Sequence, residues 1–297
     1  MNVTHSGMLC CNAARGLWRG TLSSSATTRA RNTNRVQSVQ RALAVLRTFD
    51  DAHQELGISE IARALNLSKS IVMRLVATLR DAGFLEHDRH SEKYRIGLGA
   101  FEVGNLYYMH ASAHREAEPL LQQLAVRLAL SAYFATLSGG RAVYVLVIEG
   151  PGPVRVGPRL GSSAPAHTTA AGKALLAFLP SDELERYLER TELVPETPRS
   201  ITSKADLREE LRQVREQGVA YNRGEHLPGV GAIGAPLFDR HRAVVASISV
   251  AFPLYLIADE RWRDIAAAVV ETAQQISRRL GIVAGRKTGD PVRIGPS

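Results

Sequence analysis

The chain is poor in cysteine, and this scarcity limits how it can be stabilised. Among its 297 residues only Cys10 and Cys11 occur. Two adjacent cysteines at one end cannot cross-link a core, and they leave residues 35–285 without a cysteine nucleophile. Because structural disulfides belong to oxidising compartments, the composition favours a reducing cytoplasm.

Long hydrophobic runs are also lacking. Apolar stretches such as residues 142–148 are far shorter than the roughly 20 residues that a membrane-spanning helix needs, so no membrane partner is expected. Residues 1–34 contain no run that resembles the hydrophobic segment of a signal peptide. A hydrophobic fraction of 45% and a charged fraction of 22% are those of a soluble globular protein, long enough for two domains.

Common enzyme motifs are absent as well. Gly172-Lys173 has His167 where a phosphate-binding loop needs its first glycine, and no Ser or Thr follows the lysine. The residues after Gly161 lack the Gly-x-Ser-x-Gly spacing of a hydrolase. These absences argue against an enzyme, and no cofactor is expected.

One set of possible metal ligands has helical spacing. Its members, His110, His114 and Glu118, would share a helix face and could suit a metal. The simpler interpretation is a solvated polar face, so no metal is expected.

The positive charge of the chain is concentrated at its ends. The net charge is +8, of which residues 1–34 contribute +4 and residues 286–297 contribute +2, leaving +2 for residues 35–285. We expect both ends to be disordered tails, so the charge says little about a folded DNA-binding surface. For residues 1–34 an arginine-rich arm that touches phosphates, or a true start at Met8, remains open.

Residues 57–79 contain two short helical patterns separated by a break. Ser59 is a candidate cap for the first pattern and Ser68 for the second. Residues 66–68 form the break, because Asn and Ser side chains bond nearby backbone groups in turns. The arrangement is typical of a helix-turn-helix, although an ordinary helical hairpin has the same spacing. The inward stripes are Ile61, Ala62 and Leu65, then Ile71, Leu75 and Leu79.

The flanking residues extend this motif. An amphipathic helix is expected over residues 36–49, and two strands at residues 84–87 and 93–96 flank a polar turn. Three helices followed by a hairpin predict a winged helix-turn-helix over residues 35–96, which favours DNA binding. Residues 97–114 are expected to form a linker helix. The apolar stripes of the two outer helices are Val39, Leu43, Leu46 and Phe49, then Leu98, Phe101, Leu106 and Met109.

Strands and helices are mixed in residues 115–285, which predicts a second domain of α+β type with a sensor role. The expected strands are residues 132–137, 142–149, 154–156, 219–221, 231–238 and 244–251, and the expected helices include residues 168–179, 202–217 and 260–280.

Taken together, these segments resemble the IclR-type transcriptional regulators. The likeness covers about residues 35–285 and is carried by residues 36–43, 58–75, 83–85, 94–97, 167–180 and 218–236. It implies an N-terminal winged helix-turn-helix and a C-terminal effector-binding domain of GAF-like fold. It also implies a homodimer or tetramer on double-stranded operator DNA that senses a small organic or aromatic acid.

The chain departs from the family pattern where family effectors bind. Ala232-Ile233-Gly234 replaces a common Cys-Ile-Ala, and Asn222 stands where an aspartate is frequent. Glu225 retains one acid of a segment that is usually more acidic. Ala232 leaves more room, or a less polar wall, than a cysteine would.

DNA contacts are expected from two elements. Lys69, Ser70 and Met73 lie early on the second helix of the motif, the part that reaches base edges in the major groove. Arg41 and Arg74 either hold phosphates or form structural ion pairs. On the hairpin, the expected backbone contacts are Lys93 and Arg95.

A small-molecule site is expected where residues 157–167 lead into a helix. Free backbone N–H groups at a helix start favour an anion such as a carboxylate. The alternative is that Thr168 caps the helix and His167 packs in the core. Together with the resemblance, this predicts an effector site made of Gly161, Ser163, His167, Thr168, Thr169, Asn222, Glu225, Ala232 and Ser249.

Two functions are therefore compared. The first is a ligand-responsive, DNA-binding transcriptional regulator. The second is a small-molecule enzyme or metabolite-binding protein whose N-terminal module contacts a partner.

Overall fold

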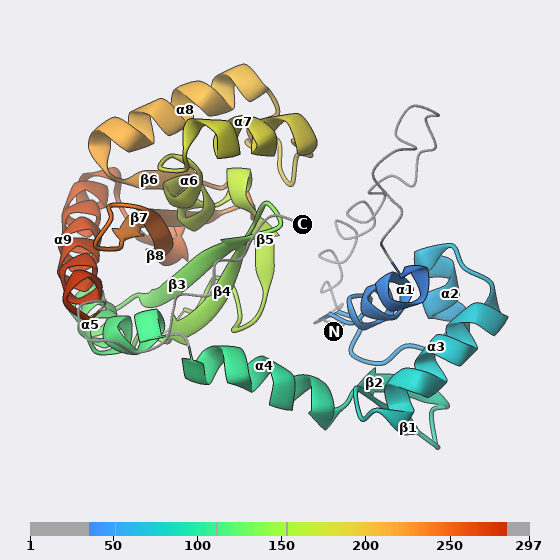
Figure 1. The fold of residues 1–297 in the computed structure, drawn as a ribbon. Helices are drawn as coiled ribbons and strands as arrows, with labels where there is room; N and C mark the ends of the chain where they lie inside the picture. The colour runs from blue at the N-terminus through green and yellow to red at the C-terminus, as the bar shows by residue number, and fades with distance from the viewer. Residues whose placement is uncertain (1–35, 51, 111, 153, 284–297) are drawn as a thin grey trace, which may run out of the picture. The chain divides into compact units, whose positions relative to one another are not determined.

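The computed structural model describes residues 36–50, 52–110, 112–152 and 154–283. The predicted tails, with both cysteines and most of the excess charge, lie outside these residues. The chain divides into two compact units, the first ending at His110 and the second beginning at Ala111 (Figure 1). No helix in the described ranges is long and apolar enough to cross a membrane.

The first unit has the predicted order of elements. Three helices, α1 (Gln37–Leu46), α2 (Ile58–Leu65) and α3 (Lys69–Asp81), precede a hairpin of β1 (Leu85–Asp88) and β2 (Lys93–Ile96), and α4 (Leu98–His110) follows. This order confirms the winged helix-turn-helix prediction.

Glycine, and not the predicted Ser59, caps the start of α2. The N–H of Gly57 donates to Glu60 Oε2 at 2.8 Å, so a side chain in the first turn bonds back to the cap residue. The helix ends at Asn66, whose φ of 51° is left-handed, a conformation that asparagine tolerates better than most residues. Ser68 stands at the N-cap of α3 as predicted, but its hydroxyl bonds Ser70 Oγ at 3.1 Å instead of the helix backbone.

The core of the first unit lies one position away from the predicted stripe on α3. Val72 and Val76 are fully buried, whereas Ile71, Leu75 and Leu79 are half-buried at the edge of the same cluster. Successive residues are about 100° apart around a helix. Because apolar residues stand on both sides of the buried row of α3, their spacing alone could not show which row faces the core. The other most buried side chains are Val45, Ile61 and Leu85.

A third segment ties the hairpin to the helices. β1 and β2 pair antiparallel, with Leu85 opposite Ile96. Leu56 forms an isolated bridge with Tyr94, with its N–H donating to Tyr94 O at 3.0 Å and its carbonyl accepting from Tyr94 N at 2.9 Å. The loop before α2 therefore fixes the hairpin against the helical part of the unit.

The second unit is built on one antiparallel sheet with the strand order β5-β4-β3-β8-β7-β6. The predicted strand at residues 154–156 is wrong: this segment is irregular, and the Val156 carbonyl accepts from the Tyr133 hydroxyl at 2.8 Å instead of joining a ladder. The strands are β3 (Ser131–Ser138), β4 (Arg141–Ile148), β5 (Ser163–Pro165), β6 (Ala220–Arg223), β7 (Val230–Phe238) and β8 (Val244–Pro253).

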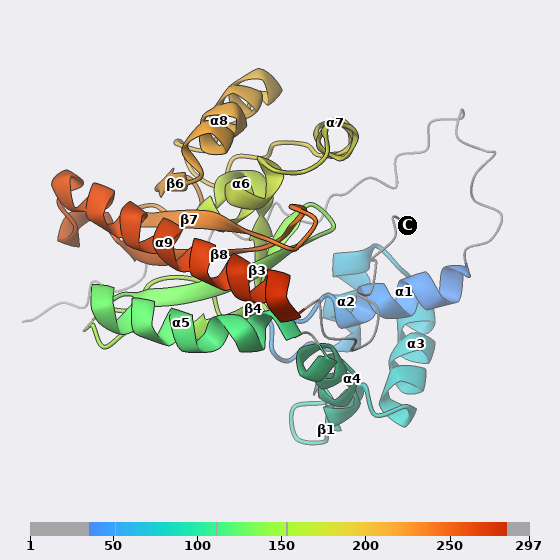
Figure 2. The same cartoon turned by 60° about the vertical axis from the view of Figure 1, so that its left-hand side comes forward.

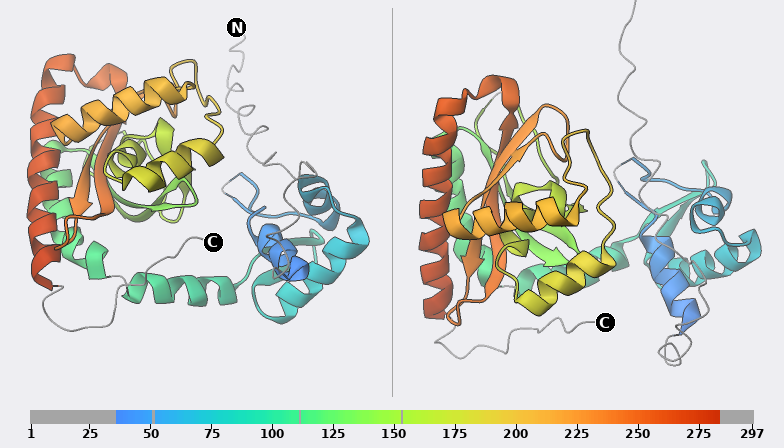
Figure 3. Two further views of the ribbon diagram at one scale, coloured as in Figure 1. Left: turned by 45° about the horizontal axis from the view of Figure 1, so that its top comes forward. Right: turned by 90° about the horizontal axis from the view of Figure 1, so that it is seen from above.

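Helices cover both faces of this sheet. On one face α5 (Ser112–Leu128) and α9 (Asp259–Val283) pack over the main hydrophobic core, as Figure 2 shows. On the other lie α6 (Ala170–Leu176), α7 (Ser181–Arg190) and α8 (Lys204–Gln217), best seen in Figure 3. Because both faces are buried, β7 and β8 are nearly continuous buried runs. The predicted α+β, GAF-like fold of this unit is confirmed.

Two 3₁₀ helices complete the second unit, η2 (Ala166–Thr168) and η3 (Leu254–Leu256). The helix predicted over residues 168–179 is therefore shorter than expected, because η2 occupies its start and Thr169 separates η2 from α6.

Candidate functional site

The first half of α3 presents the predicted base-contacting side chains to solvent. Lys69, Ser70, Met73 and Arg74 are exposed, and Met73 keeps 58% of its surface open. Among the described residues neither Lys69 nor Arg74 has an ion-pair partner, and Arg41 lies half-buried on α1 without one. An open, cationic helix face of this kind suits entry into a DNA groove.

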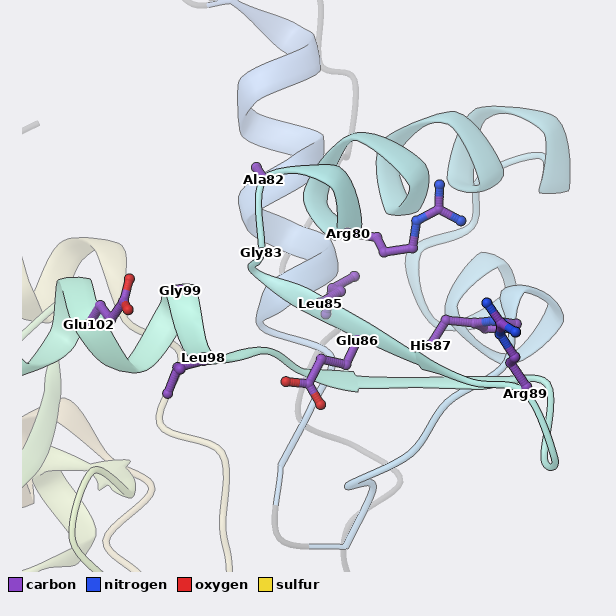
Figure 4. A pocket seen from close by; sticks show the side chains of 10 residues that line it. All are labelled: Arg80, Ala82, Gly83, Leu85, Glu86, His87, Arg89, Leu98, Gly99 and Glu102. Carbon is purple, nitrogen blue, oxygen red and sulfur yellow. The ribbon is translucent and has the colours of Figure 1, made fainter.

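The two predicted hairpin cations are already paired within the unit. Lys93 Nζ lies 3.7 Å from Glu60 Oε2, and Arg95 donates to Glu86 Oε2 through Nε at 3.0 Å and Nη2 at 2.9 Å. Arg89, which sequence reasoning missed, is exposed at the hairpin turn (Figure 4), and no described residue pairs with it. The sequence could have indicated it, because Arg89 lies between Asp88 and His90 in the predicted polar turn of the hairpin.

A groove of about 770 Å³ opens where the end of α3, β1 and the start of α4 meet (Figure 4). Glycine backbone forms this junction: Gly99 N donates to Gly83 O at 2.9 Å. A Cβ added to Gly97 would lie 2.4 Å from the same Gly83 oxygen. The linker helix therefore begins in direct backbone contact with the junction between α3 and the hairpin.

Both outer helices of the first unit carry exposed apolar side chains. Sequence periodicity placed Val39 and Leu43 on an inward stripe of α1, but they are 54% and 52% exposed. On α4, Phe101 is 65% exposed and makes no contribution to the core of its own unit. The exposed apolar residues of the two helices, with the adjoining Val36, are Val36, Val39, Leu43, Leu98, Phe101, Val103, Leu106 and Tyr107.

In the second unit, part of the predicted effector site lies on the sheet face that α6 covers. Ser249 on β8 stands between Gly234 and Tyr133 on the neighbouring strands, and the Ser247 hydroxyl on the same face is fully buried without a hydrogen-bond partner. The two serines are two residues apart on one predicted strand, so the sequence could have placed both on the same face of the sheet. We call this surface the alanine–serine patch: Ala135, Ala142, Ala164, Ala171, Ala232, Ala251, Ser247 and Ser249.

Two tyrosines border the patch, and sequence reasoning missed both. Tyr133 packs edge-on against Tyr144 with ring centroids 6.0 Å apart. Burial raises the pKa of Tyr144 to about 12, although a hydrogen bond with Thr169 acts in the opposite direction. Both hydroxyls therefore stay protonated near neutral pH, but the Tyr133 hydroxyl already donates to Val156 O and Tyr144 is hydrogen-bonded with Thr169.

Thr169, and not Thr168, caps α6. The Thr169 hydroxyl accepts from Gly172 N at 3.0 Å, whereas the Thr168 hydroxyl donates to Pro165 O at 3.0 Å. With seven residues and this cap, α6 offers less to an anion than the sequence argument assumed. His167 is 1% exposed and packs beside Tyr187, as the core alternative predicted.

Asn222 and Glu225 make internal contacts. The Asn222 amide donates to Thr168 O at 2.6 Å and accepts from the N–H groups of Gly224 and Glu225. Both Glu225 oxygens lie 2.9 Å from Lys173 Nζ, which is 1% exposed. These residues hold α6 to the loop before β7. Breaking a buried pair of this kind typically costs about 3–5 kcal/mol.

Gly161 and Ser163 lie at the sheet edge, away from Ala232 and Ser249 in the strand order. Gly161 has a φ of 79° in an exposed turn, and its N–H donates to Tyr144 O at 2.7 Å. The Ser163 hydroxyl accepts from Arg141 Nε at 2.9 Å. The nine predicted effector residues are thus distributed over three places: the alanine–serine patch, the β5 edge with η2 and the start of α6, and β6 with the loop that follows it.

The polar face proposed around His114 is not solvated at that residue. His114 is 1% exposed, and burial lowers the pKa of its imidazole. Within the described ranges no group of three or more His, Cys, Asp or Glu side chains is placed to hold a metal.

A winged helix-turn-helix with an open recognition helix, joined to an α+β unit, is the architecture of a DNA-binding transcriptional regulator. Residues 38–89 match the model of the IclR helix-turn-helix domain, and residues 106–278 match the bacterial transcriptional regulator IclR C-terminal model. The chain belongs to the IclR family of bacterial transcriptional regulators.

Individual relatives agree with this assignment. The chain is 32% identical over 246 residues to the HTH-type transcriptional regulator KdgR of Escherichia coli K12, across 83% of this chain and 93% of KdgR. The crystal structure of an IclR transcriptional regulator from Alicyclobacillus acidocaldarius has a TM-score of 0.73 and 28% identity, covering 83% of this chain and 100% of that one. An IclR homologue from Microbacterium hydrocarbonoxydans, solved with 4-hydroxybenzoate, shares the fold with a TM-score of 0.69 at 23% identity, covering 82% and 98% of the two chains.

Proposed function

We propose that this regulator binds operator DNA as a homodimer and that a small organic or aromatic acid in the sensor unit controls the binding. The observation that carries the DNA-binding part is the open face of α3, where Lys69 and Arg74 have no internal partner among the described residues. The first residues of such a helix contact base edges, and Arg74 then lies toward the phosphates.

The homodimer is supported by the apolar surface of α1 and α4. Side chains such as Leu43 and Phe101 are costly to leave in water, and the number of them exposed on α1 and on α4 supports an interaction site there. A second copy is the occupant that the function requires, since paired recognition helices match paired half-sites in an operator. A tetramer would need a further surface on the sensor unit.

The effector is proposed to bind at the alanine–serine patch. Small side chains line this face, where the α6 backbone packs close to Gly234, and Ser247 has a buried hydroxyl without a partner. The unpartnered Ser247 hydroxyl can donate to a carboxylate, which supports an acid as the ligand. Because one fold relative was solved with 4-hydroxybenzoate, that acid is a reasonable probe beside small aliphatic acids.

Fluorescence anisotropy on the chain's own upstream DNA tests the proposal. We expect saturable binding that exceeds binding to a shuffled duplex, and a change in affinity when the effective acid is added. Ser247→Ala should abolish the response to the acid but leave operator binding intact. Ser138→Ala, which changes an exposed serine at the end of β3, should leave both the response and operator binding unchanged. Equal affinity for operator and shuffled DNA would refute the proposed function.

Lys69→Ala tests the base-contacting role directly. A good base contact contributes roughly 1–3 kcal/mol of discrimination, so operator affinity should fall about tenfold or more. Affinity for shuffled DNA should fall much less. Arg63→Ala, which removes an exposed cation from α2, is the matched control and should affect both duplexes little. An equal loss on both duplexes in Lys69→Ala would contradict base contact.

A further inference from the structure

The sensor unit contains a polar cluster at its β5 edge that is separate from the alanine–serine patch. It gathers side chains from the start of β4, from η2, from the loop after α7 and from the loop before β7. We call it the Arg141 cluster: Arg141, His167, Thr168, Glu196 and His226. His167 and Thr168 are almost completely buried, and the other three are half-buried.

Direct contacts hold the parts of this cluster in place. Arg141 Nε and Nη2 donate to the hydroxyl and carbonyl of Ser163, both at 2.9 Å. The Thr168 hydroxyl lies 3.5 Å from His226 Nδ1, and Tyr187 OH lies 3.4 Å from His167 Nδ1. Each cluster residue from the sheet edge and η2 is therefore anchored by at least one neighbour.

The loop that carries Glu196 is anchored as well. The Thr197 hydroxyl donates to Gly224 O at 2.7 Å, and the Ser200 hydroxyl donates to Glu225 O at 2.6 Å. These bonds join the loop after α7 to the residues that immediately precede His226. The arrangement is preorganised before any ligand arrives.

Hydrogen-bonding capacity is left over on two side chains of this cluster. Glu196 Oε1 and His167 Nε2 are buried without a hydrogen-bond partner. A guanidinium has five N–H groups, and Arg141 uses two of them on Ser163. Buried polar atoms without partners are rare and costly in folded proteins, so each of these two atoms needs an explanation.

The charges of the cluster act on one another although Arg141 and Glu196 form no ion pair. Burial raises the pKa of Glu196, and the Arg141 charge opposes that shift. Burial lowers the pKa of His226 to about 4, and Arg141 lowers it further, so this imidazole is neutral at pH 7. The cluster thus combines the Arg141 cation, a carboxyl group whose pKa is raised by burial, and neutral histidines.

We propose that the Arg141 cluster is a second small-molecule site that binds a small hydroxy carboxylate. The carboxylate binds the Arg141 guanidinium, whose planar N–H groups match two carboxylate oxygens. The ligand hydroxyl donates to Glu196 Oε1 and accepts from a neutral histidine. A singly charged acid balances Arg141, whereas a phosphate dianion would also face the Glu196 carboxyl. The site is distinct from the alanine–serine patch and does not depend on DNA binding.

Isothermal titration of the full chain with glycolate, acetate and inorganic phosphate tests this site. Glycolate should bind saturably, and acetate, which lacks the hydroxyl, should bind about tenfold more weakly because it leaves Glu196 unsatisfied. Phosphate should also bind more weakly than glycolate. Absence of saturable glycolate binding to the folded chain, or equal binding of acetate and glycolate, would overturn the proposal.

Two variants locate the site. Glu196→Gln should weaken glycolate about tenfold and leave acetate unchanged, and Arg141→Lys should weaken both acids. Glu192→Gln, which neutralises an exposed carboxylate of the same loop, is the matched control and should change glycolate affinity less than twofold.

If Arg141→Lys fails to fold because Arg141 also holds Ser163, Glu196→Gln decides alone, since Glu196 Oε1 has no partner to lose. Unchanged glycolate affinity in Glu196→Gln, or an equal loss in Glu192→Gln, would overturn the site.

Discussion

At the scale of single residues, the hairpin divides its positive charges into two kinds. Arg95 and Lys93 face carboxylates in their own unit, so contact with a phosphate would first have to replace those pairs. Arg89 has no such competitor among the described residues. An unpaired exposed cation is the one that releases counterions most fully when it meets DNA.

Arg89→Ala should therefore reduce the dependence of DNA affinity on salt. Loss of one phosphate contact lowers the slope of log affinity against log salt by about 1. Arg95→Ala is the matched control on the same hairpin, and its slope should change less because Glu86 already neutralises that cation. Anisotropy titrations over a salt series measure both slopes. A larger change in Arg95→Ala than in Arg89→Ala would show that the internal pair opens on DNA.

His226 should make the chain less stable in mild acid. Its folded pKa of about 4 lies below the ordinary value of 6.5, so the unfolded chain binds the proton more readily. The stability it contributes is complete above about pH 6.5 and is lost as the pH falls towards 4.

The loss of melting temperature between pH 7 and 4.5 should be smaller in His226→Gln than in the original chain. His241→Gln, which changes an exposed histidine, serves as the control. If the two variants lose melting temperature equally over this range, His226 is not a source of the acid sensitivity.

Helical periodicity was enough to place Lys69 and Met73 on the outer face of α3. It could not show that Arg95 is paired, because that contact depends on the register that sets Glu86 opposite Arg95 across the hairpin. The Arg141 cluster was missed for a similar reason. Its members come from four separate segments, and only the folded sheet brings them together.

At the scale of elements, most predicted helices and strands exist, and the errors lie at their ends and edges. The strand expected at residues 154–156 has apolar β-formers, yet Tyr133 bonds its carbonyl and the short β5 pairs with β4 instead. Pairing of an edge strand is decided by partners distant in sequence, which local composition does not contain.

The contact between α4 and the hairpin gives a prediction at this scale. In Gly97→Ala the new Cβ would lie 2.4 Å from Gly83 O and 3.1 Å from the Leu85 backbone, and backbone atoms cannot move aside cheaply. We expect a destabilisation of about 1–3 kcal/mol and a lower melting temperature.

Gly104→Ala is the matched control for this prediction. It lies within α4 with nothing inside 4 Å of the added Cβ, so it should stabilise the helix by about 0.5–1 kcal/mol. Differential scanning calorimetry compares the two variants. If both raise or both lower the melting temperature alike, the close backbone packing at Gly97 is not what sets its tolerance.

At the scale of the whole molecule, the apolar stripes of α1 and α4 show what one sequence leaves undecided. Val39 and Leu43 have the spacing of core residues, and only their exposure shows that they are not core in a single chain. Hydrophobic periodicity predicts that one face of a helix is buried, but it does not show whether that face packs against the same chain or against another one.

Phe101→Glu should therefore weaken self-association. A charge at the centre of an apolar interface is expected to raise the dimer dissociation constant more than tenfold, equivalent to at least about 1.4 kcal/mol. Leu160→Glu, at an exposed apolar residue of the sensor unit, is the control. Sedimentation equilibrium gives both constants. An unchanged constant in Phe101→Glu would place the dimer contact elsewhere.

The glycine junction between α3 and α4 has a mechanical consequence. With 13 residues, α4 is a rod of about 20 Å, and its first turn is fixed to the end of the recognition helix by the Gly99–Gly83 bond. A tilt of about 10° along such a rod displaces one end by about 3 Å relative to the other. That distance is close to the roughly 3.4 Å step between base pairs. A small angular change at one end of α4 is thus enough to take the recognition helix out of register with its half-site.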